Sequence, residues 1–357
     1  MNVLLDVTAA MRPDLTGIGV YASNLMRHLA LRPDLNVRGV WRLARHKRRR
    51  WLPLHLASPA RPYLPLLSGL NLTGHDIYHG TDFRIPAWGR FRTVVTIHDL
   101  VVHENGLVDG RFAAEGIAKL ERTLFRHRPD RIITVSGFTR DRLIGQYPAL
   151  APITHAVHLG VDPRFAADDG MPLPEAIGNR PYILSVGSVE KRKNLMATVR
   201  AFEEIYRHHP ELRLLIAGGS GHGAEDIDAM IRSSSATEAM VRLGFVADAM
   251  LPALYRNATC FLYPSLYEGF GLPILEAMAA GCPVVTSNRG AMAEVAGDAA
   301  LLADPGEPDD IAAKVLQAIG EDGERGRMIA AGRERAAYST WDRCAAETVA
   351  VYRAALE

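Results

Sequence analysis

The stretch YEGFGLPILEAMAAGCPVV, residues 267–285, places two carboxylates on either side of a glycine turn. Pro273 suits the first turn of a helix, and the glycines allow the backbone to approach a ligand closely. A helix that begins after such a turn binds phosphate through its free N–H groups. Ionised carboxylates instead accept hydrogen bonds from vicinal hydroxyls. The stretch therefore predicts a ligand with a hydroxylated ring on each side of a diphosphate, with Glu268 before the turn and Glu276 in the helix's first turn.

Each glutamate also has a simpler explanation when it is taken alone. Glu276 would complement the helix dipole, and Glu268 would be a solvated loop residue. The pair brackets the backbone N–H groups of Gly271 and Leu272, which are the expected phosphate donors, and this arrangement favours the ligand hypothesis. The preceding YPS at 263–265 ends a predicted strand, so the turn is expected at the carboxyl edge of a parallel sheet, where such folds bind ligands.

A second turn, SVGSVEKRKNL at 185–195, brings three cations to the end of another predicted strand. Arg and Lys at this position can neutralise charge that grows on a departing diphosphate. A run of charge is usually a solvated face, and this is the expectation for Lys191. We expect Lys193 to be a phosphate ligand, with Arg192 second.

The strand predicted to end at TIHDL places a histidine where ligands bind. His98 is expected to hydrogen-bond a sugar hydroxyl, and Asp99 to orient it or to face the acceptor; a purely structural histidine is the alternative. The remaining histidines form no set with metal-ligand spacing, and neither H-E-x-x-H nor a D-x-D element beside a strand end occurs. We therefore expect no metal.

The loop DLTGIGVYA, residues 14–22, matches G-x-G-x-x-A, which is a weak signal by itself. The predicted strand NVRGVW at 36–41 lacks the acid that would hold an NAD ribose. Gly17 and Gly19 are therefore interpreted as letting a helix N-terminus face a ligand's phosphates in an interdomain cleft.

The whole chain has the composition of a soluble globular protein with two domains: 357 residues, 48% hydrophobic and 23% charged. No apolar run is long enough for a membrane span, and Asp6 interrupts the apolar start where a signal peptide would continue. Three widely spaced cysteines suit reduced thiols in the cytoplasm. Residues 1–170 carry 23 Lys and Arg against 15 Asp and Glu, whereas the remainder carries 18 against 25. The basic half is expected to meet an anionic partner.

Short apolar runs alternate with helical patterns along the chain, which predicts doubly wound α/β domains. This rhythm occurs twice. A segment rich in glycine, proline and acids interrupts it and is interpreted as a linker. The predicted strands are 2–7, 36–41, 76–80, 92–99, 131–136, 152–162, 181–188, 212–219, 240–246, 259–265, 282–288 and 299–304. The predicted helices are 18–31, 111–128, 137–147, 192–209, 223–235, 247–256, 273–280, 308–319, 323–336 and 339–356. The predicted domains are 1–165 and 181–338, with the linker at 166–180 and a closing helix at 339–357.

Together these motifs resemble the retaining, nucleotide-sugar-dependent glycosyltransferases of family 4, a group 1 family with the GT-B fold. The resemblance also covers VSGFTRDRL, HLGVDPRF and LLIAGGSG, and its most specific part is the pair of glutamates with seven residues between them. It implies two Rossmann-like doubly wound domains facing a deep interdomain cleft. The closing helix would cross back to the first domain, and the domains would close by hinge motion at the linker and near 335–340.

Several roles are carried over by the resemblance. Glu268 would contact the donor sugar and Glu276 the ribose, while Arg192 and Lys193 would hold the diphosphate. Some relatives have an arginine where this chain has Ser188, so that part of the clamp would rest on the other two cations. The donor-binding residues implied are Glu276, Gly271, Leu272, Phe270, Gly269, Gly17, Gly19, Ser188, Gly244 and Val246.

The reaction implied is hexosyl transfer with retention from a nucleoside diphosphate sugar to a hydroxyl of a glycan or lipid-linked acceptor. The form SVEKRKN favours mannose or a deoxyhexose as the transferred sugar. The stretch RHKRRRWLPL, Arg45–Leu54, suits an anionic membrane surface; a solvated loop is an equal alternative. The protein would then be cytoplasmic or peripheral at the inner face of the membrane, with no nucleic-acid partner.

Three other functions stay open at this level. An NAD-dependent oxidoreductase is disfavoured by the missing ribose acid. A catalytically silent nucleotide-sugar-binding subunit is disfavoured by the intact glutamates and cations. A sugar-nucleotide epimerase would consume donor without any acceptor.

Overall fold

The computed structural model describes residues 1–12, 15–52, 61–63, 74–86, 89–168, 170–174, 177–178, 180–221, 223–320 and 323–357. Asp14 of the glycine loop, Pro53 and Leu54 of the basic stretch, and four positions of the predicted linker lie outside these residues. The chain forms two compact units, residues 1–160 with 341–357, and residues 161–340. The segment predicted as a linker, 166–180, falls inside the second unit by this division.

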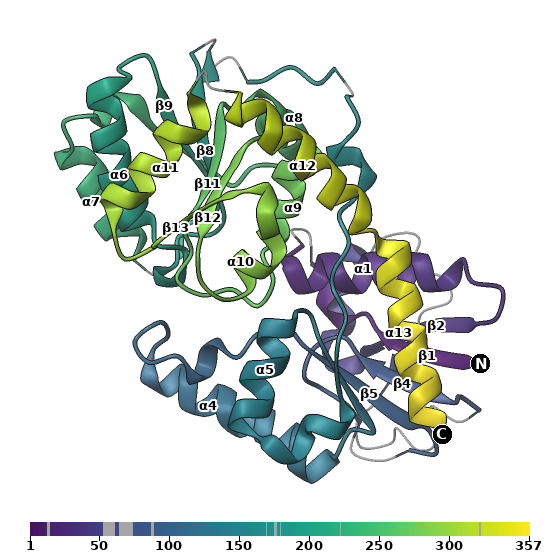
Figure 1. The fold of residues 1–357 in the computed structure, drawn as a ribbon. Helices are drawn as coiled ribbons and strands as arrows, with labels where there is room; N and C mark the ends of the chain where they lie inside the picture. Colours follow the sequence, from purple (N-terminus) through teal and green to yellow (C-terminus); the bar gives the residue numbers. More distant parts are fainter. Residues whose placement is uncertain are drawn as a thin grey trace. The chain divides into compact units, whose positions relative to one another are not determined.

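The first unit is built on a parallel sheet (Figure 1). Within the described residues its strands are β1 (Asn2–Asp6), β2 (Asn36–Arg42), β3 (Arg61–Tyr63), β4 (Ile77–Gly80), β5 (Arg92–Ile97), β6 (Arg131–Thr134) and β7 (Thr154–Ala156). Its helices are α1 (Gly17–Ala30), α4 (Gly110–Glu121), α5 (Gly137–Gln146) and α13 (Trp341–Leu356). Short 3-10 turns cover Thr8–Ala10, Leu43–Trp51, Val101–His103 and Pro148–Ile153, and a π turn covers Arg122–His127.

Strands β1, β4, β5 and β6 are mainly buried on both faces of this sheet, as expected for a parallel sheet that helices cover on each side. Helices α1 and α13 pack together on one face. Leu120 of α4 and Leu143 of α5 share a core with Val95 and Ile132 on the other. The closing helix thus belongs to the first unit, although most of the intervening chain belongs to the second.

The second unit repeats the design with strands β8 (Tyr182–Val186), β9 (Arg213–Ala217), β10 (Met240–Gly244), β11 (Cys260–Tyr263), β12 (Val284–Ser287) and β13 (Leu301–Ala303). Its helices are α6 (Leu195–His208), α7 (Ala224–Ser233), α8 (Leu251–Asn257), α9 (Leu272–Ala279), α10 (Gly290–Ala296), α11 (Pro308–Ile319) and α12 (Glu324–Tyr338). Short 3-10 turns cover Pro163–Phe165, Lys191–Lys193, Thr237–Ala239 and Gly297–Ala299. Figure 1 shows α6, α7 and α11 on one face of the sheet, with α8, α9 and α12 on the other.

The two sheets share one strand order. It is β3-β2-β1-β4-β5-β6-β7 in the first unit and β10-β9-β8-β11-β12-β13 in the second, with parallel pairing throughout the described strands. Successive crossovers change direction between β1 and β4, and again between β8 and β11. Ligands of open parallel sheets bind at the carboxyl ends of the strands at such switch points.

Each strand predicted from the sequence is present in the structure, most with ends that differ by one to three residues. The strand predicted over 152–162 is much shorter, since β7 covers only Thr154–Ala156. Strand β3 and helix α10 were not predicted, since both are short. The helix predicted over 192–209 begins only at Leu195, because Asn194 has the left-handed φ of 58° and closes a separate 3-10 turn. Glu276 is the fifth residue of α9, so the prediction that places it in the first turn is wrong by about one residue.

Candidate active site

The loops that follow β8 and β11 meet at the switch point of the second unit. The N–H of Leu266 donates to the carbonyl of Arg192 at 2.7 Å. The Asn194 side chain donates to the carbonyls of Pro264 at 3.0 Å and Pro305 at 2.7 Å. Since one amide group joins three loops, the 3-10 turn that carries the predicted cations is fixed against the loop that carries Glu268.

Four side chains form a charged cluster across these loops. Lys193 Nζ lies 2.6 Å from Glu268 Oε1, and Arg192 Nη1 lies 2.5 Å from Glu268 Oε2. The Tyr263 hydroxyl, at the end of β11, donates to Glu268 Oε1 at 3.0 Å, and Lys193 Nζ lies 4.6 Å from the centre of its ring. The side chains of Lys193 and Glu268 are each only 11% exposed. We refer to Arg192, Lys193, Tyr263 and Glu268 as the switch-point cluster.

The electrostatics of the cluster follow from burial and pairing. Burial raises the pKa of Glu268, but Lys193 and Arg192 outweigh it, so the pKa lies below its usual range and the carboxylate is charged. Burial lowers the pKa of Lys193, and Glu268 opposes that shift. A partly buried anion with two cations is a site prepared for a second anion, because the cations are already fixed in position and partly shielded from solvent.

Glu190 holds Arg192 from the other side. Its Oε2 accepts a hydrogen bond from Arg192 Nε at 2.7 Å, and its other oxygen accepts one from the Ser188 hydroxyl. Arg192 therefore bridges two carboxylates, Glu190 and Glu268. Sequence reasoning proposed Ser188 as a donor-binding residue and did not consider Glu190. The sequence pattern S-x-E-x-R, formed by Ser188, Glu190 and Arg192, could have indicated this contact, since it places the three side chains close together in one turn.

Two glycines are required where the backbone passes close to the cluster. Gly187 has φ 145°, and a Cβ there would lie 3.1 Å from Lys193 Cε. Gly271 has φ 105° and is the N-cap of α9, so its own N–H and that of Leu272 have no acceptor within the helix. Gly269 and Phe270 form the turn between Glu268 and this cap, and Phe270 is buried.

Glu276 lies one turn into α9 and has a separate partner. The Tyr255 hydroxyl, from α8, donates to its Oε2 at 3.0 Å. Burial raises the pKa of Glu276 to about 7, against the effect of that hydrogen bond. The two glutamates are thus in opposite electrostatic states: Glu268 is held ionised by cations, whereas Glu276 titrates near neutrality. The predicted binding of ribose hydroxyls by Glu276 stays a prediction, and it requires the ionised form.

The two residues expected near a donor base lie at the end of β10. Gly244 has φ 66°, and its carbonyl accepts from the N–H of Gly218 at 2.7 Å. Val246 is half-buried, and Phe245 beside it is 61% exposed. Base recognition by these residues stays a prediction.

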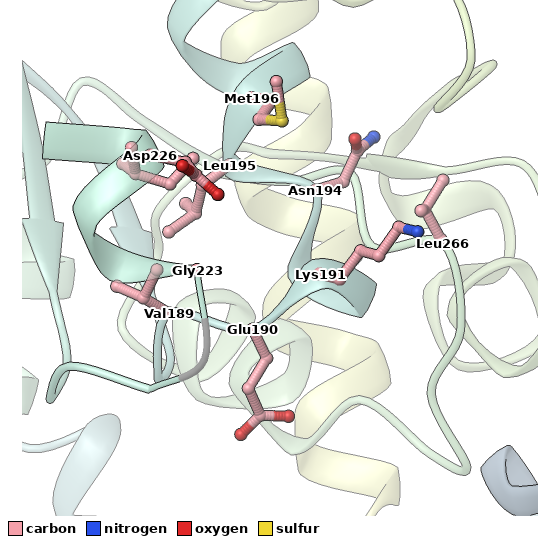
Figure 2. Close-up of a pocket in the computed structure, with 10 residues that line it drawn as sticks. Val189, Glu190, Lys191, Asn194, Leu195, Met196, Gly223, Asp226 and Leu266 are labelled. Atoms are coloured by element: carbon pink, nitrogen blue, oxygen red, sulfur yellow. The ribbon is translucent and has the colours of Figure 1, made fainter. Parts of the chain in front are cut away.

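A pocket of about 370 Å³ opens beside the cluster (Figure 2). Figure 2 shows Lys191 and Leu266 on one side, and Val189 with Asp226 of α7 on the other. The exposed position of Lys191 agrees with the expectation that it is solvated. Because the lining is mainly apolar, the pocket suits an uncharged group rather than a diphosphate.

At the switch point of the first unit the two histidines are uncharged. His98 Nε2 lies 2.8 Å from the carbonyl of Thr81, which can only accept, so this nitrogen carries the proton and Nδ1 is an acceptor. Burial lowers the pKa of His98 to about 4, and the ring packs edge-on to Tyr21. His79, at the end of β4, bonds Tyr352 and Thr96 at 2.7 Å each, and burial lowers its pKa to about 3.

The remaining predicted residues of this unit lie at the starts of its loops and helices. Asp99 Oδ1 accepts from the N–H of Val101 at 3.1 Å, which stabilises the turn after β5. Gly17 is the first residue of α1, and a Cβ on Gly19 would lie 3.0 Å from the carbonyl of Ala9. Their predicted roles toward an acceptor and a donor stay predictions.

Sequence reasoning missed Tyr263, Tyr255 and Glu190. Tyr263 ends β11, and Tyr255 lies in α8. Both segments have an apolar pattern in the sequence, in which an aromatic residue is expected for packing alone. Only the contact of each hydroxyl with a glutamate identifies it as part of the site.

Among the described residues, no group of three or more His, Cys, Asp and Glu side chains is placed to hold a metal ion. Within the same ranges, no helix combines the length and the hydropathy that a bilayer span requires. The three cysteines are buried and unpaired.

Comparison with known proteins connects this geometry to a family. Residues 174–335 match the model of glycosyl transferases group 1. O-antigen chain mannosyltransferase B of Escherichia coli is 34% identical over 286 residues, which cover 78% of this chain and 74% of that protein. The chain belongs to the group 1 glycosyltransferases.

Other similar proteins place this glycosyltransferase within a wide family. The MMP alpha-(1->4)-mannosyltransferase of Mycolicibacterium hassiacum is 29% identical over 68% of this chain, which spans 58% of that relative's length. The structure of Anabaena HepE in complex with UDP and glucose has a TM-score of 0.79 at 18% identity, covering 99% of this chain and 100% of HepE. Sucrose-phosphate synthase of Thermosynechococcus elongatus has a TM-score of 0.75 at 20% identity, covering 99% and 98%. The glycosyltransferase therefore has the GT-B fold predicted from its motifs.

Proposed function

We propose that this glycosyltransferase moves a mannosyl or related hexosyl group from a nucleoside diphosphate sugar to a hydroxyl of a glycan or lipid-linked acceptor, with retention at the anomeric carbon. One observation carries the proposal: two partly buried cations, Arg192 and Lys193, meet one ionised glutamate at the switch point of the second unit. Similarity to two proteins named mannosyltransferases supports mannose as the transferred sugar.

The cluster supplies the charge that this reaction needs. When a nucleoside diphosphate leaves the sugar, negative charge grows on its terminal phosphate, and Lys193 and Arg192 would stabilise it. Both cations are bound to Glu268 in the donor-free protein. An arriving diphosphate would share these cations, which would free carboxylate lone pairs to accept from hydroxyls of the transferred sugar.

The donor would lie along the turn that opens α9. The N–H groups of Gly271 and Leu272 would bind phosphate oxygens, as at other helix N-termini. Glu276 would accept from the ribose hydroxyls in its ionised form, and Tyr255 would hold it in place. Gly244 and Val246 would contact the base through the backbone.

The retaining step requires no additional base in this scheme. The leaving diphosphate accepts the proton of the attacking hydroxyl on the face that the sugar keeps, while the two cations stabilise its charge. We propose on this basis that transfer proceeds without a metal. In the first unit, His98 would accept a hydrogen bond from a sugar hydroxyl through Nδ1, and Asp99 would face the acceptor.

A donor panel tests the proposal directly. Thermal unfolding is measured with GDP-, UDP- and dTDP-sugars, and the first sugar released by slow donor hydrolysis is followed by proton NMR. The expected result is stabilisation by one class of donor, lost in Lys193→Met, and release of the anomer that the donor contained. Release of the opposite anomer would contradict retention, and donor binding without consumption under any condition would favour a silent binding subunit.

A further inference from the structure

A second charged site lies in the first unit, in a pocket of about 400 Å³ that the donor chemistry does not use. Its lining residues are Arg42, Phe83, Arg84, Ile85, Lys119, Arg122, Thr123 and His127. Arg42 is the last residue of β2, and Phe83–Ile85 follow β4. The other four residues come from the end of α4 and from the π turn after it. Five basic side chains from three parts of the chain therefore surround one cavity.

The π turn Arg122–His127 explains how two of these side chains reach the same pocket. Residues five apart in an α-helix differ by about 140° around the axis, so Arg122 and His127 would diverge. A π turn bonds residues five apart and brings them closer to one side. The N–H of Arg128 donates to the carbonyl of Thr123 at 3.1 Å, and Arg128 then takes the left-handed φ of 47°. Such turns are rare in helices and frequent at functional sites.

Among the described residues that line the pocket, five are basic and none is acidic. Acids lie behind this lining: Asp82 Oδ2 lies 3.2 Å from Arg84 Nη1, and Asp82 is also close to Arg42 and Asp6. Burial raises the pKa of Asp82 to about 6, which weakens its charge further. Lys119 Nζ lies 3.5 Å from Glu115 Oε2 at the surface of α4, so this cation has an exposed acidic partner.

The pKa of His127 is that expected where cations gather. Burial and the neighbouring Arg126 and Arg122 lower this pKa below its usual range. The pocket thus brings Arg42, Arg84, Lys119 and Arg122 around one space that an anion can enter.

We propose that this pocket binds the phosphate or diphosphate group of the acceptor substrate. Arginine forks bind phosphate oxygens in pairs, and Arg84 and Arg122 can do so while Lys119 contributes charge. Phe83 and Ile85 line the same pocket and would contact an apolar group next to the phosphate. The statement that the ligand is the acceptor rests on the proposed function; the statement that the pocket binds phosphate does not.

Titration with pyrophosphate tests the site on the whole chain. Because pyrophosphate would also bind Arg192 and Lys193, calorimetry is done on both the natural protein and the Lys193→Met variant. Lys119→Gln with Arg122→Gln is expected to weaken pyrophosphate binding at least tenfold in the Lys193→Met background. Arg111→Gln with Arg140→Gln removes two charges from exposed helical positions of the same unit. This control is expected to change the affinity for pyrophosphate less than twofold. An equal loss of pyrophosphate affinity in both double variants would overturn the proposal, because binding would then depend only on the general surface charge.

The source of the phosphate is resolved with vesicles. Vesicles that contain dodecyl phosphate are compared with vesicles of equal charge that contain phosphatidylglycerol. Binding to dodecyl phosphate that is lost in Lys119→Gln with Arg122→Gln would assign a lipid-linked phosphate, whereas response to pyrophosphate alone would assign a soluble one. Equal binding to both vesicles, unchanged in that variant, would count against the site. If no nucleoside diphosphate sugar stabilises the protein, the proposed function is contradicted. The pyrophosphate titration would still test whether the pocket binds phosphate.

Discussion

The switch points of the two units have the same place in the same strand order, yet they differ in charge. In the second unit, Glu268 is ionised between Lys193 and Arg192. In the first unit, His98 is neutral and bonded to a backbone carbonyl. Since the sheets are alike, topology decides where a site forms and side chains decide its chemistry. A cluster of cations suits a leaving diphosphate, whereas a neutral imidazole suits hydroxyl groups.

The largest effect is expected from removing charge at the second switch point. Lys193→Met and Glu268→Gln should each lower kcat at least tenfold, and about a hundredfold if the charge acts mainly in the transition state. Lys191→Met removes the same charge from the same 3-10 turn at an exposed position and should leave kcat unchanged. Steady-state turnover of the best donor measures all three. Near-normal turnover by Lys193→Met would remove the cluster from the mechanism.

Loss of stability must be separated from loss of catalysis in these variants. Removing one partner of a buried ion pair costs about 3–5 kcal/mol, because the other charge is left unpaired. Denaturant unfolding should therefore show Lys193→Met to be less stable than the natural protein. The double variant Lys193→Met with Glu268→Gln should lose less than the sum of the single losses. Additive losses would mean that the two side chains do not interact as the distances indicate.

Substitution at the first switch point is expected to have a smaller effect with a different pH signature. His98→Ala should lower kcat/KM about tenfold, and His98→Asn should restore part of it because an amide can also accept and donate. The pKa of His98 is about 4, so the imidazole stays neutral between pH 5 and 8. The difference between natural protein and His98→Ala should therefore be constant across that range. A difference that appears only below pH 6.5 would mean that the charged imidazole participates.

Glu276 is expected to give the second unit a pH dependence that the first lacks. Its pKa is about 7 in the folded protein, so the carboxylate that binds ribose forms as the pH rises through 7. Donor affinity should rise severalfold between pH 6 and 8, with kcat little changed. Glu276→Gln should bind donor weakly at every pH. Calorimetric titration at three pH values measures this, and a flat profile in the natural protein would contradict the assignment.

The raised pKa of Glu276 affects folding stability in the opposite direction from donor affinity as the pH rises. Because the folded pKa of Glu276 lies above its unfolded value, protonation favours the folded state, and this contribution falls as the pH rises from about 4.5 through 7. The folded pKa of His98 lies below its unfolded value, so the contribution of His98 is present above pH 6.5 and is lost as the pH falls toward 4. Unfolding of His98→Asn and Glu276→Gln should thus depart from the natural protein at opposite ends of the pH range.

Hydrophobic periodicity and motif spacing in the sequence were sufficient to predict the strands, most helices and the loops that carry the charged residues. They were insufficient where contacts between residues distant in sequence decide the pairing or the pKa of a side chain. Glu268 and Arg192 were both predicted as site residues, but their pairing depends on the two loops meeting across neighbouring strands. The pKa of Glu276 depends on burial, which no local pattern reveals. The phosphate pocket depends on a π turn, and helical periodicity predicts an unbroken helix there.

The smallest effects are expected from Glu190 and Ser188, since the Glu190 side chain holds Arg192 and Ser188 holds Glu190. Glu190→Gln keeps the length of the side chain but weakens its bond to Arg192 Nε, so the guanidinium should lose orientation rather than charge. The KM for donor should rise two- to fivefold with kcat nearly unchanged, because Lys193 still stabilises the leaving group. Ser188→Ala, which removes the hydroxyl bound to the other oxygen of Glu190, should have less effect. A fall in kcat as large as that of Lys193→Met would mean that Glu190 contacts the reacting groups, and the second switch point would then hold three functional acids rather than two.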